Sequence, residues 1–287
     1  MSDAFVLGAV AYDPKVVTIW DGFVRWFAEQ GFAFDYVLFT HYERLVEAQF
    51  AGAVDCAWNS PLAWVESERL AARLGRSARA VAMRDTDQDL TSVVVVRRDG
   101  DVRAVGDLRG RKVGVGAHDS PQATILPLAH LAAQGLEPRR DFDVVLHDVL
   151  VGKHGDHVGG ERDAVKALLA GTVDAACVLD ANVATFVREG TAREGSLRVL
   201  TQTAPYDHCN FTVLDGAPEG AVARFTELLF AQRYDDAAVR PLMDLEGLKA
   251  WRPGRVSGYA ALSAACDRFG TVDPWLARAS ARFGKGA

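Results

Sequence analysis

Two histidines and two carboxylates lie close together in the stretch GKHGDHVGGE, residues 152–161. They are His154, Asp156, His157 and Glu161. Imidazole and carboxylate groups are common ligands of divalent metals. A helix over residues 154–161 would place both histidines and Glu161 on one face, at spacing i, i+3 and i+7. His154 and Asp156 also match one half of a two-histidine, one-carboxylate iron site. A divalent metal is therefore one possible cofactor, and the residue types alone do not identify it.

Glycines argue against that helix, because each one costs a helix about 1 kcal/mol relative to alanine. The segment contains Gly155, Gly159 and Gly160. We expect instead a strand that ends near Val151, a glycine-rich loop, and a helix that begins near Gly160.

Such a loop could fold back toward His118 and Ser120, and Glu161 would then sit in the first turn of the helix, where a carboxylate suits the dipole. Three roles stay open for His154 and His157: exposure to solvent, metal binding and contact with a ligand. We favour ligand contact, because an imidazole can donate to an oxygen or become cationic against an anion.

Two Ser-Pro pairs form the strongest binding signal in the chain. They occur in WNSP, residues 58–61, and in HDSP, residues 118–121, each directly after a predicted strand. Serine is a favoured helix N-cap and proline a favoured first helical residue, and helix N-termini attract anions. The residues expected to contact a ligand here are Asn59, Ser60, His118, Asp119, Ser120, Gln122 and Thr124. Asp119 would repel an anion unless it is paired or holds a cation.

Other candidates follow the first strand and the return segment YDHCNF. Tyr12 could offer its hydroxyl or ring face to the same ligand. Five residues could act in catalysis if the protein is an enzyme: His118, His154, His157, His208 and Cys209. Cysteine is more often a small buried apolar residue than a nucleophile, so Cys209 alone does not show whether the protein is an enzyme or a binding protein.

Strands alternate with helices along the chain, which predicts an α/β fold with mainly parallel sheets. One phrase occurs twice, AQFAGAVDCA at residues 48–57 and ALLAGTVDAA at residues 167–176. A helix that ends at glycine and turns into a V-D-x-A strand, once in each half, indicates two similar α/β lobes.

The order of these motifs, above all DLRGRKVGVG at residues 107–116, resembles the phosphonate, phosphite and sulfonate solute-binding proteins of ABC importers. The resemblance implies the two-lobe type II periplasmic-binding-protein fold. Lobe 1 would comprise residues 1–92 plus 208–287, lobe 2 residues 93–207, and two hinge strands would join them. It also implies closure on a small anionic or polar ligand and an ABC transporter as partner.

The chain departs from this family at the ligand. HDSPQAT stands where members have a Ser-Thr-Ser-Gly-like helix start, and WNSP replaces the usual first-lobe turn. The alternative is a cytoplasmic enzyme on the same scaffold, a lyase, decarboxylase or hydrolase that uses the cleft histidines and, in one version, a metal.

Composition excludes some partners and suggests a location. The 287-residue chain has a net charge of −6, which argues against a nucleic-acid surface, and no apolar run reaches the roughly 20 residues of a membrane span. The N-terminal sequence lacks a signal peptide pattern. We therefore expect a cytoplasmic protein as given, or a periplasmic or extracellular one if a signal peptide was removed. The four cysteines have no CxxC spacing and are expected to be free thiols.

Overall fold

The computed structural model describes residues 4–284 and divides into two compact units, which are treated separately below. Within the described range, unit 1 contains residues 4–88, 207–260 and 270–284. Unit 2 contains residues 89–206 and 261–269. The chain therefore leaves unit 1 after Gln88 and returns to it at Asp207, and most of one C-terminal helix groups with unit 2.

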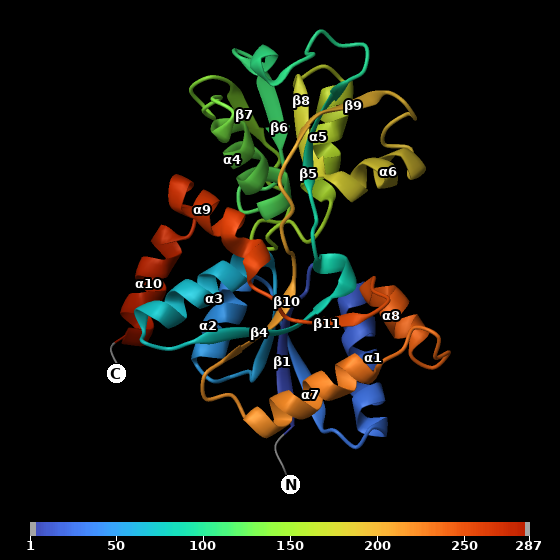
Figure 1. Cartoon of the computed structure of the whole chain (residues 1–287), viewed down its shortest axis with the longest axis vertical. Coiled ribbons are helices and arrows are strands. Elements are labelled where there is room, and N and C mark those ends of the chain that lie inside the picture. The colour runs from blue at the N-terminus through green and yellow to red at the C-terminus, as the bar shows by residue number, and fades with distance from the viewer. Residues whose placement is uncertain (1–3, 285–287) are drawn as a thin grey trace. The chain divides into compact units, whose positions relative to one another are not determined.

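Unit 1 is built on a six-stranded mixed sheet in the order β11-β4-β10-β3-β1-β2 (Figure 1). Its strands are β1 (Phe5–Val10), β2 (Phe34–Phe39), β3 (Cys56–Asn59), β4 (Ala78–Arg84), β10 (Asn210–Leu214) and β11 (Trp251–Pro253). Its helices are α1 (Lys15–Glu29), α2 (Tyr42–Phe50), α3 (Pro61–Arg73), η1 (Asp85–Asp87), α7 (Glu219–Ala231), α8 (Arg240–Glu246), η4 (Ser257–Tyr259) and α10 (Asp273–Phe283). β1 pairs in parallel with β2 and β3, whereas β10 runs antiparallel to its neighbours β3 and β4.

Helices cover both faces of this sheet because each carries one apolar stripe. In α1, Ile19, Phe23 and Phe27 are buried at helical spacing and pack with residues of α7 against one face. On the other face α2, α3 and α10 pack together, with Leu45, Leu70 and Leu276 in their shared core. Unit 1 is thus a three-layer α/β sandwich.

Unit 2 repeats the plan with a five-stranded sheet in the order β7-β6-β8-β5-β9. Its strands are β5 (Ser92–Arg97), β6 (Lys112–Val115), β7 (Asp143–Leu146), β8 (Ala175–Leu179) and β9 (Leu197–Gln202). Its helices are η2 (Val105–Leu108), η3 (Pro121–Ile125), α4 (Leu126–Ala133), α5 (Gly159–Leu169), α6 (Asp180–Arg188) and most of α9 (Ala260–Phe269). β6 is parallel to β7 and β8, and β5 is antiparallel to β8 and β9.

The repeated sequence phrase has the same structure in both units. The helices α2 and α5 are each followed by a left-handed glycine, Gly52 with φ +75° and Gly171 with φ +76°. After that glycine the chain enters β3 in unit 1 and β8 in unit 2. The aspartate that follows the valine of the repeated phrase then bonds the turn to the first parallel strand of the unit, β1 in unit 1 and β6 in unit 2. The Asp55 carboxylate accepts from the Val6 N–H at 2.8 Å, and the Asp174 carboxylate accepts from the Lys112 N–H at 2.9 Å. The expectation of two similar α/β lobes is confirmed.

The predicted crossing strands each belong to one unit. β5 lies in unit 2 and β10 in unit 1, so the chain crosses just before each of them. The two crossings are tied together within each unit. In unit 1 the His208 N–H donates to the Asp87 carbonyl at 2.8 Å, and in unit 2 the Leu90 N–H donates to the Tyr206 carbonyl at 2.8 Å.

All four cysteines are buried free thiols, as expected. Across the described residues, no helix has both the length and the apolar character needed to cross a membrane.

Candidate ligand-binding site

The first Ser-Pro pair starts helix α3 in unit 1. Ser60 is its N-cap, Pro61 is the first helical residue, and the Ser60 hydroxyl accepts from the Ala63 N–H at 3.1 Å. Pro61 has no N–H and the Ala63 N–H is bonded to Ser60, so the Leu62 N–H is the first-turn donor left for a ligand. Asn59 is fully buried, and its amide donates to the Ser67 hydroxyl at 3.2 Å.

The second Ser-Pro pair starts the helix η3–α4 in unit 2 in the same way. The Ser120 hydroxyl accepts from the Ala123 N–H at 3.2 Å, with Pro121 again first in the helix. Thr124 is buried and donates to the Ala117 carbonyl at 2.8 Å, which fixes the turn but commits that hydroxyl hydrogen. Both predicted N-caps are therefore present.

The strand before the histidines ends earlier than the sequence suggested. β7 ends at Leu146 rather than near Val151, because the chain turns at Asp148, where the Val149 N–H donates to the His147 carbonyl at 2.8 Å. Residues 147–158 form a long loop, which we call the histidine loop. Helix α5 begins at Gly159, one residue from its predicted start.

The histidine loop packs on the Ser120 turn, as the sequence led us to expect. The Gly152 N–H donates to the Asp119 carboxylate at 2.5 Å, and the Gln122 amide donates to the Gly155 carbonyl at 2.5 Å. A β-carbon on Gly155 would lie only 2.2 Å from the Ser120 hydroxyl oxygen, so only glycine allows this approach. Asp119 is thus paired with a backbone donor through one of its oxygens.

The hydrogen bond of His157 decides which of its nitrogens carries hydrogen. Its Nδ1 accepts from the Gly159 N–H at 3.2 Å, so a neutral ring must hold its proton on Nε2. That Nε2 is buried and has no hydrogen-bond partner in the part of the chain that the structure describes. His157 therefore presents a fixed, unused N–H donor.

The other metal candidates do not join His157 in one cluster. The Glu161 carboxylate accepts from the Leu179 N–H and from the Asn182 amide, each at 2.9 Å, and so ties α5 to β8 and α6. His154 is fully buried with φ +49°, and Asp156 is half-buried. Among residues 4–284, His154, Asp156, His157 and Glu161 do not together form a group whose ligand atoms could share one ion.

Tyr12 and His118 lie in different surroundings. Tyr12 is half-buried against the α1 side of unit 1, with the Lys15 ammonium 5.8 Å from its ring centre. His118 is exposed and pairs with Asp148, whose carboxylate is 3.0 Å from its Nδ1. His208 and Cys209 lie beside Asp87 in unit 1, where Cys209 Sγ is 3.1 Å from His208 Nδ1.

One possible ligand contact, Trp64, was not predicted from the sequence. Trp64 lies in the first turns of α3 with 1 % of its surface exposed, and its indole N–H is buried with no acceptor among the described residues. Its ring packs against Tyr259, with ring centres 5.7 Å apart. The signal was present in WNSPLAW, since Trp64 follows the N-cap by one helical turn, but an aromatic there reads equally well as core.

Residues 8–262 match the family described as "ABC transporter, phosphonate, periplasmic substrate-binding protein". The chain belongs to this family. The match favours a binding protein over the alternative of an enzyme on the same scaffold.

Several solved structures share the fold of this chain. PhnD1 from Prochlorococcus marinus, in complex with methylphosphonate, is 15 % identical with a TM-score of 0.70, covering 93 % of this chain and 98 % of that one. XAC2383 from Xanthomonas citri, bound to ATP, is 18 % identical with a TM-score of 0.70 and coverages of 94 % and 99 %. A binding-protein component of an ABC phosphonate transporter from Pseudomonas aeruginosa is 12 % identical with a TM-score of 0.64, covering 99 % of each chain. A search of curated proteins found no significant match.

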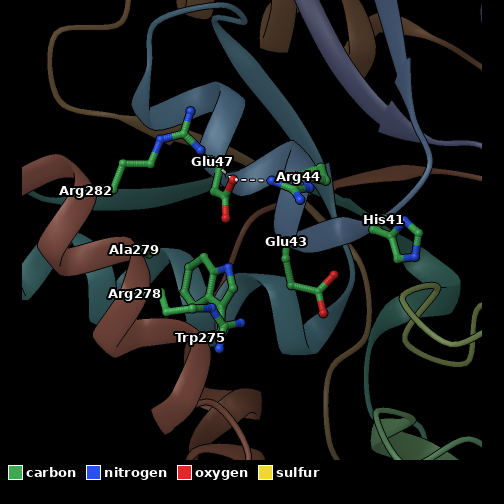
Figure 2. Close-up of a pocket in the computed structure, with 8 residues that line it drawn as sticks. All are labelled: His41, Glu43, Arg44, Glu47, Trp275, Arg278, Ala279 and Arg282. Carbon is green, nitrogen blue, oxygen red and sulfur yellow. Dashed lines mark hydrogen bonds and ion pairs between the residues drawn. The ribbon is translucent and has the colours of Figure 1, made fainter.

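This phosphonate-family protein also has a charged pocket between α2 and α10 of unit 1, of about 460 Å³ (Figure 2). It is lined by His41, Glu43, Arg44, Glu47, Trp275, Arg278, Ala279 and Arg282. The Glu47 carboxylate accepts from Arg44 at 3.1 Å and from Arg282 at 2.8 Å, so much of its charge is already balanced internally. Neither Ser-Pro turn contributes to it.

We expect Arg278→Gln to leave the dissociation constant for methylphosphonate within about twofold of the unmodified protein. Arg278 lines this pocket and not the Ser-Pro turns, so its charge should not matter to the ligand. Isothermal titration calorimetry checks this. A loss of tenfold or more would move the anion site to the pocket in Figure 2.

Proposed function

We propose that this substrate-binding protein takes up a phosphonate, held by the Ser60 turn of unit 1 and by the Ser120 turn and histidine loop of unit 2. The family match over residues 8–262 carries the proposal. PhnD1, which shares the fold, was solved with methylphosphonate. The proposed contacts are Asn59, Ser60, Trp64, Asp119, Ser120, Gln122, His154 and His157.

Two buried donors support an anionic ligand. The Trp64 indole N–H in unit 1 and the His157 Nε2–H in unit 2 each lack an acceptor within the described chain. A buried donor without a partner costs about 1–3 kcal/mol, so such groups usually serve a bound molecule or an ordered water. The oxygens of an oxyanion would satisfy both.

Three buried acceptors support a ligand that also donates. They are Asn59 Oδ1, Asp119 Oδ1 and Gln122 Oε1, none of which has a hydrogen-bond partner among residues 4–284. A phosphonate monoanion retains one P–O–H group, whereas a sulfonate has none. The Asp119 oxygen in particular would repel a group made only of acceptors. These oxygens therefore favour phosphonate over sulfonate.

Calorimetric titration with methylphosphonate, inorganic phosphate and ethanesulfonate tests this assignment. We expect methylphosphonate to bind and ethanesulfonate to bind at least about tenfold more weakly, because the P–O–H of the phosphonate can pair one of the acceptors whereas the sulfonate can pair none. His157→Ala should weaken methylphosphonate binding by roughly tenfold or more. His130→Ala is the matched control, because His130 is bonded to Thr201 at 2.8 Å on the far end of α4.

Equal affinity for the sulfonate would contradict the role of the three acceptors. Unchanged affinity in His157→Ala would remove the histidine loop from the site. Absence of heat with all three oxyanions would overturn the proposed ligand class.

We also propose that the protein works in the periplasm and delivers its ligand to an ABC importer, as the family description implies. Recovery of the native protein in the cytosolic fraction of its own cells would contradict this location.

A further inference from the structure

Three side chains of unit 1 that are not among the proposed ligand contacts converge at one point, two of them buried and the third, His208, 12 % exposed. Cys209 Sγ lies 3.1 Å from His208 Nδ1, and His208 Nδ1 lies 3.4 Å from Asp87 Oδ1. The three ligand atoms all lie within 4.8 Å of one another. In a tetrahedral zinc site with Zn–S near 2.3 Å and Zn–N or Zn–O near 2.1 Å, neighbouring ligand atoms are about 3.5 Å apart. Two of the three separations are therefore close to those of a metal site, and the third is no more than 4.8 Å.

The single hydrogen or lone pair of His208 Nδ1 cannot form a hydrogen bond with both of its neighbours in this trio. His208 Nδ1 contacts both other groups, but it carries either one hydrogen or one lone pair. If it donates to Asp87, it cannot accept from the Cys209 thiol. If it accepts from the thiol, its lone pair and the Asp87 oxygen are two acceptors 3.4 Å apart with no hydrogen between them. A cation placed among the three atoms would use a lone pair from each.

The charges around the trio also favour a cation. The Arg84 guanidinium binds both Asp87 oxygens, at 2.6 and 2.8 Å, and lies 3.3 Å from the Glu246 carboxylate. Asp87 and Glu246 are both buried. With neutral His208 and Cys209, the charges of Arg84, Asp87 and Glu246 sum to −1. A divalent cation with a cysteine thiolate brings that sum to zero.

The three ligands are held in place by their surroundings. The backbone of His208 is fixed by its N–H bond to the Asp87 carbonyl at 2.8 Å and by the Tyr259 hydroxyl, which donates to the His208 carbonyl at 2.8 Å. Arg84 orients the Asp87 carboxylate, as outer partners of metal ligands commonly do. The His208 side chain keeps 12 % exposure, which gives an ion a short path inward.

We propose that Asp87, His208 and Cys209 bind one Zn²⁺, with the fourth position open to water. On binding, the S–H bond of Cys209 breaks, a Zn–S bond forms and the proton passes to solvent. His208 binds through Nδ1 as a neutral imidazole, and Asp87 binds through Oδ1. The site joins the two segments at which the chain leaves and re-enters unit 1, and none of its three residues is among the proposed phosphonate contacts.

Zinc titration of the metal-stripped full-length protein against a chromophoric chelator tests the site. We expect one Zn²⁺ per chain, and Cys209→Ala should weaken its affinity at least about tenfold, because it removes the thiolate. Cys177→Ala is the matched control, since Cys177 is also fully buried but lies in β8 of unit 2. Equal affinities in all three proteins would overturn the assignment.

Cobalt substitution provides a second measurement that needs no variant. Co²⁺ bound to a thiolate gives a near-ultraviolet charge-transfer band and tetrahedral d–d bands, so we expect both in the unmodified protein. Zn²⁺ should abolish them by displacement. A protein that binds no zinc and shows no thiolate band holds a hydrogen-bonded trio only, and the proposal fails.

Discussion

Gly155→Ala is expected to lower the free energy of unfolding of unit 2 by about 3 kcal/mol. Its φ of +76° costs an alanine roughly 1–2 kcal/mol, and the new methyl would lie 2.2 Å from the Ser120 hydroxyl and 2.7 Å from the Gln122 amide. Relief of these clashes must push the histidine loop off the Ser120 turn. Methylphosphonate binding should weaken at the same time. Urea unfolding and calorimetry measure the two effects.

Gly190→Ala separates the clash from the backbone strain. Gly190 lies in the same unit with φ +81°, but nothing lies within 4 Å of the position of its β-carbon. We expect it to cost only about 1 kcal/mol and to leave binding intact. If both variants lost the same stability, the histidine loop would not be packed on Ser120.

Arg84→Met is expected to destabilise unit 1 by about 3–5 kcal/mol, because it removes the cation that two buried carboxylates, Asp87 and Glu246, share. The methionine keeps much of the side-chain volume over the Trp58 ring, so the loss reports charge rather than a cavity. Arg233→Met is the matched control. Arg233 pairs with Asp235 on the surface, both being 77 % exposed, and its loss should have little effect.

The pH dependence of stability distinguishes this mechanism from general damage to the fold. Burial opposes the charge of Asp87, but the Arg84 guanidinium outweighs it and lowers the pKa of Asp87 from 3.8 to about 2. In the metal-free protein the pair therefore contributes stability above pH 4, and this contribution is lost as the pH falls toward 2. In Arg84→Met the buried carboxyl lacks its cation, so the destabilisation should shrink as acid protonates it. A deficit independent of pH would contradict the charge argument.

The sequence predicted the local features of both units because their causes lie within a few residues. The Ser60 and Ser120 caps depend on a hydroxyl and a backbone N–H three residues apart. The turns at Gly52 and Gly171 depend on glycine at a left-handed position. The early end of β7 was missed because the turn at Asp148 that ends it contains no glycine or proline to mark it in the sequence.

Of the candidate site, the sequence identified the turns and the loop but not how their atoms are used. The contact of the histidine loop with Ser120 was expected from the order of the strands. The unused N–H of His157 was not, because it depends on which atom its other nitrogen meets. Trp64 gave no more than the signal of a core aromatic, and only its buried N–H, without an acceptor among the described residues, distinguishes it.

The sequence by itself determined the α/β class, the internal repeat and the family, because strand and helix periodicity, caps and glycine turns are encoded over short spans. Only the tertiary structure brought Arg84 and Asp87 beside His208, Cys209 and Glu246. Those groups are more than 100 residues apart in the chain, and β10 brings the return segment next to β4 by antiparallel pairing. The spacing of His208 and Cys209 from Arg84 and Asp87 follows from that pairing, and Glu246 lies shortly before β11, which also pairs with β4. No pattern along the chain contains this pairing, because a strand's neighbour is decided by which faces and edges of the whole sheet are buried together.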